Sequence, residues 1–160
     1  VSLYVSRAAE KLRRQQSYTG MVHVYIRTSP FNPRQKYYAN GISLPLSPPT
    51  DSTLLLTKTA LWGLRRIYRR GYCYQKAGVM LSELVSRQYR QLDLFGPAST
   101  MVADKKSTNM MNIVDQINAR MGRGTIKLAS EGFRQPWKMK QGNKSPCYTT
   151  NWDELICVLK

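Results

Sequence analysis

Residues 1–90 alternate between two hydrophobic periodicities. Apolar residues recur at helical spacing in residues 3–15, with basic residues on the other positions. Residues 21–27, 38–46 and 75–85 instead alternate apolar and polar side chains. Because strand side chains point to opposite faces in turn, whereas helical ones repeat about every 3.6 residues, these patterns predict one helix and three strands.

A second, longer helix is predicted between the last two strand patterns. Pro48 and Pro49 interrupt the strand, Asp51 caps the helix and Gly71 stops it. Its predicted buried stripe consists of Leu54, Leu61, Leu64, Ile67 and Tyr68.

The order helix, strand, strand, helix, strand is typical of an α+β fold. Such a chain packs two helices on one face of an antiparallel or mixed sheet and leaves the other face free. Val22, Val24 and Ile26 are expected to face the core, and His23 is expected to be a satisfied sheet histidine. The free face is predicted to carry Tyr25, Arg27, Ser43, Lys76 and Gly78.

The charge of the chain favours a polyanionic partner. Its 160 residues include 25 Lys and Arg against 9 Asp and Glu, a formal net charge of +16. Residues 1–90 hold 15 basic and 3 acidic residues, net +12, and residues 91–160 hold 10 and 6, net +4. Nucleic acid is the favoured partner, because no apolar run approaches the roughly 20 residues of a membrane span. Composition alone supports a structural RNA-binding domain equally well.

One end of the sheet combines cations with hydroxyl groups, as phosphate recognition requires. Arg27, Thr28 and Ser29 are followed by Arg34 and Lys36. Any sheet surface must be polar, so the excess charge of the whole unit, rather than any single residue, favours binding. Arginines near the end of the second helix have a simpler explanation, since cations complement a helix C-terminus.

Catalysis and metal binding are poorly supported. The nine acidic residues include no pair on a predicted strand that would converge on a metal. Three cysteines form no C-x-x-C pair and there is one histidine, so we expect no metal site and a reduced, cytoplasmic protein.

A pentapeptide follows the basic unit: Gln91, Leu92, Asp93, Leu94 and Phe95. By pattern alone it fits equally a docking peptide, the end of a strand, or an amphipathic turn packed on the core. The string resembles the bacterial sliding-clamp-binding motif Q-L-[SD]-L-F at every position. Residues 96–108, rich in Gly, Pro, Ser, Thr and charge, are predicted to be a linker.

Four further blocks, at residues 6–13, 28–31, 74–81 and 145–150, resemble the C-terminal half of the UmuC family of Y-family translesion polymerases. The resemblance implies that residues 1–90 form the little finger domain, which lies against primer-template DNA. The little-finger sheet of about four strands includes one strand that would precede Val1. The family's S-P-R-Y-T-T has Cys147 in place of its arginine here, so no role of that arginine is carried over.

The resemblance also implies which partners this segment binds and that the catalytic domain lies outside it. The catalytic palm with its Mg²⁺-binding carboxylates would lie before Val1, so this segment is expected to bind DNA without polymerising and to need no cofactor. The implied partners are primer-template DNA, the sliding clamp (β subunit), the processed UmuD dimer and RecA, at the nucleoid. Residues 109–160 would be a small α/β appendage with a helix at 109–121 and a strand at 125–129. Its candidate partner-binding residues are Trp137, Tyr148 and Trp152.

Overall fold

The computed structural model describes residues 1–89, 99–133, 143, 145–150 and 155. Three helices and three strands follow one another along the described chain. They are α1 (Ser2–Arg14), β1 (Ser17–Thr28), β2 (Ala39–Thr50), α2 (Thr53–Ile67), β3 (Tyr74–Ser86) and α3 (Ser99–Met121). Short 3-10 turns lie at Arg87–Tyr89 and Ala129–Glu131.

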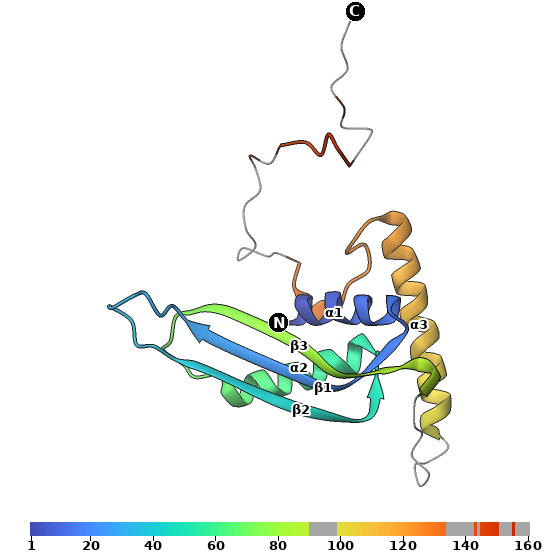
Figure 1. The fold of residues 1–160 in the computed structure, drawn as a ribbon, viewed down its shortest axis with the longest axis horizontal. Coiled ribbons are helices and arrows are strands. Elements are labelled where there is room, and N and C mark those ends of the chain that lie inside the picture. Colours follow the sequence, from blue (N-terminus) through green and yellow to red (C-terminus); the bar gives the residue numbers. More distant parts are fainter. Residues whose placement is uncertain (90–98, 134–142, 144, 151–154, 156–160) are drawn as a thin grey trace, which may run out of the picture.

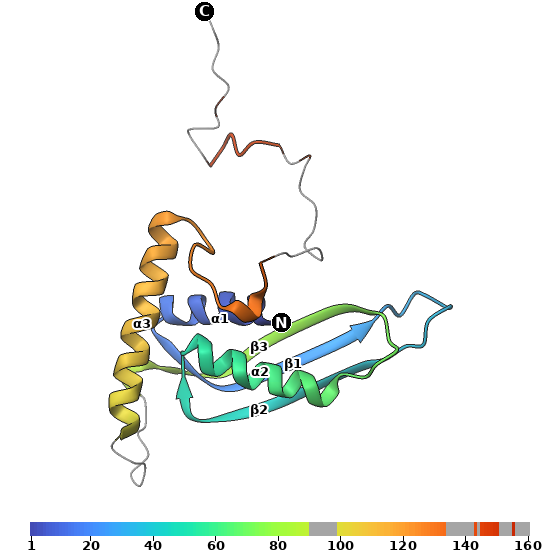
Figure 2. The same cartoon turned by 180° about the vertical axis from the view of Figure 1, so that it is seen from behind.

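The three strands form one antiparallel sheet in the order β2-β1-β3. Helices α1 and α2 pack on the same face of this sheet, and Figure 2 looks onto α2 lying across the strands. The arrangement confirms the predicted α+β class. The predicted count of about four strands included one before Val1, and the described residues supply the other three.

The core lies between the helices and the sheet. Val22, Val24 and Ile26 of β1 are buried there, as their alternation predicted. Helix α1 contributes Val5 and Ala9 to the same cluster. The periodicity of residues 3–15 and 21–27 therefore identified the buried faces of both elements correctly.

The predicted buried stripe of α2 was right for Ile67, which is buried, and wrong for Leu54 and Tyr68, which are exposed. The residues that face the sheet are Leu56, Ala60, Gly63 and Ile67, whereas Leu54 is 46% exposed. The cause is the close approach of α2 to β2: a β-carbon at Gly63 would lie 2.7 Å from Leu44 Cδ1. Small residues therefore occupy the contact, where a choice of the largest aliphatic residues could not find them.

Both predicted ends of α2 also need correction. Ser52, not Asp51, is the N-cap residue, and the helix ends at Ile67 rather than near Gly71. The carboxylate of Asp51 is buried and forms an ion pair with Arg87, after the end of β3. Asp51 therefore joins the start of α2 to the end of the sheet.

The C-terminal part differs from its prediction in two places. Helix α3 includes the expected helix at 109–121 but begins at Ser99, so much of the predicted linker at 96–108 is helical. Residues 125–129 form no strand; turns lead into the 3-10 turn that begins at Ala129. No helix in the described part of the chain is both long and apolar enough to cross a membrane.

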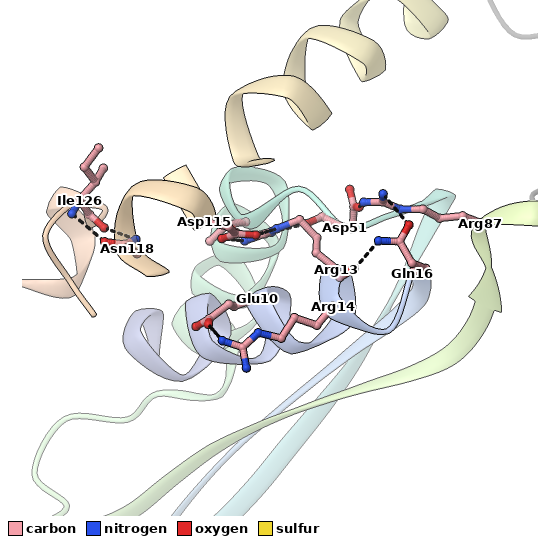
Figure 3. Close-up of polar contacts among 10 residues, drawn as sticks. Glu10, Arg13, Arg14, Gln16, Asp51, Arg87, Asp115, Asn118 and Ile126 are labelled. Atoms are coloured by element: carbon pink, nitrogen blue, oxygen red, sulfur yellow. Dashed lines mark hydrogen bonds and ion pairs between the residues drawn. The ribbon is translucent and has the colours of Figure 1, made fainter. Parts of the chain in front are cut away.

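Helix α3 is held against α1 by a buried arginine. Arg13 is 5% exposed, and its Nε and Nη2 atoms donate to Asp115 Oδ2 and Oδ1 at 2.6 and 2.8 Å. Its Nη1 donates to the Asp51 carbonyl and to Thr53 Oγ1, each at 2.8 Å. Figure 3 shows Arg13 reaching from α1 to Asp115 on α3. One side chain therefore joins α1, the start of α2 and α3.

Candidate nucleic-acid interface

The face of the sheet opposite the helices is open. On the central strand β1 it is formed by every second residue, His23, Tyr25 and Arg27. The strand register places three rows of residues across this face, each row with its middle member on β1. The rows are Ser43, His23 and Met80; Gly41, Tyr25 and Gly78; and Ala39, Arg27 and Lys76.

The aromatic ring of Tyr25 lies directly over the backbone of Gly78. A β-carbon built on Gly78 would lie 2.3 Å from Tyr25 Cζ and 2.4 Å from its hydroxyl oxygen, so no larger residue fits beneath the ring. Tyr25 nevertheless remains 41% exposed. A glycine inside a strand commonly marks such a close approach. The phenol ring is therefore laid across the sheet instead of standing away from it.

His23 occupies the neighbouring row in a similar way. A β-carbon on Gly41 would lie 3.0 Å from His23 Nε2, and His23 Nδ1 shares a hydrogen bond of 2.9 Å with Ser43 Oγ. The expectation of a satisfied sheet histidine is therefore confirmed. The His23 and Tyr25 rings have centroids 6.3 Å apart. Both rings therefore lie close to the backbone of the sheet, each beside a strand glycine.

Positive charge gathers at one end of this face. Arg27 and Lys76 are exposed and occupy opposite positions on β1 and β3. A groove of about 870 Å³ borders β3, and Arg7 and Lys11 of α1 line it together with Lys76. Glu83 is the single acidic residue in the three strands, and it lies seven residues along β3 from Lys76. The local charge therefore favours an anionic ligand.

The loop between β1 and β2 extends the same end of the sheet (Figure 1). Arg34 and Lys36 are exposed on this loop, and Ser29 is partly buried with its Oγ accepting a hydrogen bond of 3.3 Å from the Phe31 amide. The prediction that Thr28 contacts phosphate needs correction, because Thr28 is 1% exposed and its Oγ accepts the Tyr38 amide at 2.9 Å. Thr28 closes the hairpin.

The remaining predicted site residues are placed less fully. Gln91, Leu92, Asp93, Leu94 and Phe95 lie outside the described residues, as do Trp137 and Trp152. Tyr148 is described and exposed. Within the described ranges, no group of three or more His, Cys, Asp or Glu side chains could hold a metal ion.

The predictions missed the contribution of Gly41 to the open face. The sequence does contain a signal for it, because two strands each carry a glycine. Once the strands are paired, Gly41 of β2 and Gly78 of β3 lie on either side of Tyr25 of β1. That pairing depends on register, and the alternation of apolar residues does not fix register when the connecting loop is long.

The fold and the site together define a class of protein: an α+β layer with two helices on one face and a flat, basic sheet surface on the other. Comparison with known families identifies it further. The model of the impB/mucB/samB family C-terminal domain matches residues 1–94. A second family, a domain of unknown function (DUF4113), matches residues 108–158. The chain belongs to the impB/mucB/samB family.

Curated relatives agree with this assignment. Protein UmuC of Salmonella typhimurium is 37% identical over 155 residues, which cover 97% of this chain and 36% of the relative. Protein SamB of the same organism is 36% identical with the same coverage, and Protein MucB of Escherichia coli is 36% identical over 100% of this chain and 37% of its own length. The chain thus spans little more than a third of each of these relatives.

Proposed function

We propose that this chain is the C-terminal, DNA-binding and clamp-tethering part of an error-prone translesion DNA polymerase that acts in the SOS response to DNA damage. The open sheet face binds primer-template DNA, and residues 91–95 bind the sliding clamp. Family membership and the basic, flat sheet face support the proposal. The polymerase works in the cytoplasm at the nucleoid, and its Mg²⁺-dependent chemistry belongs to a palm domain outside these 160 residues.

The observation that carries the DNA-binding part is the Tyr25 ring lying over Gly78, next to the pair Arg27 and Lys76. A low surface lets the sugar-phosphate backbone come close to the sheet, and the two cations then reach phosphate oxygens. Contacts of this kind position a protein on a duplex without reading its bases. A polymerase that copies damaged templates needs this kind of grip, because it must hold any sequence.

The clamp-tethering part rests on the five residues Gln91, Leu92, Asp93, Leu94 and Phe95. In the sequence they begin two residues after Tyr89, the last residue of the short 3-10 turn that follows the sheet. A tether at this point raises the local concentration of the DNA-binding face at a primer end that carries a clamp, without any new contact to DNA. The C-terminal region, with Trp137, Tyr148 and Trp152, would serve the processed UmuD dimer and RecA.

The DNA-binding part is tested by competition between labelled primer-template DNA and structured RNA of equal length for the 160-residue chain. We expect DNA to compete better, and we expect Arg27→Ala with Lys76→Ala to weaken DNA binding. The control is Arg120→Ala with Arg123→Ala, which removes two exposed cations from the end of α3 and its following turn. Equal or better competition by RNA would instead support a structural RNA-binding domain.

The clamp part is tested separately by sedimentation or pull-down with the purified sliding clamp. Leu94→Ala with Phe95→Ala should abolish clamp binding and leave the far-ultraviolet circular dichroism spectrum unchanged, since apolar plugs dominate such peptide contacts. The matched control is Leu54→Ala with Leu55→Ala, another pair of adjacent apolar residues, which lies on the exposed side of α2. Undiminished clamp binding by the first variant would overturn this part of the proposal.

A further inference from the structure

The side of α2 that faces away from the sheet carries a second basic surface. Trp62 follows Lys58 by four residues and precedes Arg65 and Arg66 by three and four, so these four residues share one stripe of the helix. The stripe lies opposite the buried residues of α2 and outside the helical layer, on the far side of the molecule from the open sheet face (Figure 2). We call these four residues the α2 stripe.

Trp62 is the centre of the α2 stripe. Its side chain is 46% exposed, and the Arg66 guanidinium carbon lies 4.0 Å from its ring centroid. A guanidinium stacked on an indole forms a flat, cationic platform. Burial does not explain an indole at this position, because Leu56, Ala60 and Ile67 of the same helix already fill the core.

A tyrosine cluster lies beyond the end of α2, where the chain leaves the helix at Tyr68. Tyr68 and Tyr74 have ring centroids 5.4 Å apart, and the Arg69 guanidinium carbon lies 5.1 Å from the centroid of the Tyr38 ring. Tyr74 fixes this segment, since its hydroxyl donates to the Arg69 carbonyl and accepts from the Arg69 amide, both at 2.9 Å. Arg69 therefore lies beyond the helix, held against an aromatic ring.

The tyrosine cluster lies near the basic end of the open sheet face. Tyr74 is paired with Thr28 in the sheet, next to the row that contains Arg27 and Lys76. Tyr74 and Lys76 also line the same groove beside β3, so the tyrosine cluster borders the basic end of the open face. Residues 52–82, which include all of α2 and most of β3, contain six Lys and Arg and no Asp or Glu, so the whole segment is strongly basic.

We propose that the α2 stripe and the adjoining tyrosine cluster bind single-stranded nucleic acid. Unpaired bases stack on the exposed rings of Trp62 and Tyr68, and the neighbouring arginines meet the phosphates. Proteins that bind single strands without sequence preference combine these same two elements, a basic track and aromatic platforms. This site goes beyond the duplex-binding sheet face, and it supplies the same molecule with a surface for an unpaired template or displaced strand.

A protein partner is the competing occupant of this helix face. It would use the exposed apolar residues Leu54 and Leu55 near the start of α2, two turns from Trp62. The charge argues for nucleic acid, since a segment with six cations and no acidic residue repels most basic partners and attracts any polyphosphate. Substitutions on α2 therefore distinguish the two ligands: a protein partner would be lost on changing Leu54 and Leu55, and nucleic acid on changing Trp62 and Arg66.

Binding of a fluorescently labelled oligothymidylate to the 160-residue chain tests the proposal. Trp62→Ala with Arg66→Ala should weaken binding about tenfold, the size expected when one base stack is lost. The control, Leu55→Ala with Arg120→Ala, removes one apolar side chain and one cation elsewhere and should leave affinity unchanged. Equal losses in the two variants, or no loss in either, would overturn the proposal.

Tryptophan fluorescence gives a second readout that does not depend on affinity. With Trp137 and Trp152 changed to Phe, Trp62 is the one tryptophan left in the sequence, and saturating oligothymidylate should quench its emission. Binding without quenching would place the strand elsewhere. Affinity for duplex DNA is measured on the same variants as an independent control. Trp62→Ala with Arg66→Ala should leave duplex affinity unchanged. Failure of the sheet-face proposal therefore appears in duplex binding, and failure of the present proposal appears in oligothymidylate binding.

Discussion

Replacing Gly78 by Ala tests directly whether the flat open face matters. The new methyl group would lie 2.3 Å from Tyr25 Cζ, whereas ordinary contacts begin at 3.4 Å, so the ring must move by about an ångström or more. The ring belongs to an exposed side chain and can turn away about its own torsions, at a cost of about 0.5–1.5 kcal/mol. Alanine also restricts the unfolded chain, which restores about 0.5–1 kcal/mol.

The two contributions to the free energy of unfolding nearly cancel, so Gly78→Ala should leave global stability within about 1 kcal/mol of the parent. Its effect should appear in DNA binding, because the displaced ring raises the surface where we propose that the backbone of the duplex approaches. We expect duplex affinity to fall about tenfold, which corresponds to about 1.4 kcal/mol or one lost charged hydrogen bond. Gly41→Ala is the matched control, since its methyl group meets His23 Nε2 at a milder 3.0 Å.

A double-mutant cycle shows whether the effect passes through the ring. Duplex affinity is measured by fluorescence anisotropy for the parent, Gly78→Ala, Tyr25→Ala and the double variant, with urea unfolding of each as the stability check. Once Tyr25 is alanine, the methyl group at position 78 meets no ring, and it should have no further effect. An equal loss in both backgrounds, or no loss in either, would refute the role assigned to this contact.

Three predictions concern the fold. Asp115→Ala should lower the free energy of unfolding by about 2 kcal/mol. This is less than the usual cost of breaking a buried ion pair, because Arg13 keeps two other acceptors. Urea unfolding that shows no loss of stability would contradict the docking of α3 by this ion pair. Leu56→Ala should cost about 2–5 kcal/mol and Leu54→Ala far less, which thermal unfolding can compare. Thr28→Val should destabilise by about 1–3 kcal/mol through an unpaired buried amide, while leaving the salt dependence of DNA affinity as it is.

Local periodicity was sufficient to predict much of the fold. The alternation in residues 21–27 and the helical spacing in residues 3–15 reflect burial against a single core, so pattern and structure agree there. The phase of α2 was not predictable in the same way. Its contact with β2 uses Gly63, whose small size is required by the closeness of two elements that meet only in the folded state.

The candidate site was predictable as a list of residues, but its geometry was not. Alternation placed Tyr25 and Arg27 on the free face, and both are exposed there. The role of Gly78 follows from strand register, which a sequence with a long connecting loop leaves open. Thr28 was misassigned because a hydroxyl next to Arg27 suits phosphate binding, yet as the last residue of β1 it falls on the buried face and closes the hairpin.

The dependence of duplex affinity on salt concentration tests the central claim most directly. Each phosphate neutralised by a cation contributes about 0.9 to the slope of log affinity against log salt concentration. If Arg27 and Lys76 of the open face each meet a phosphate, changing both to Ala should reduce the magnitude of that slope by about 1.8, while Arg120→Ala with Arg123→Ala leaves it unchanged. A slope that stays the same when Arg27 and Lys76 are replaced would contradict DNA binding by the sheet face.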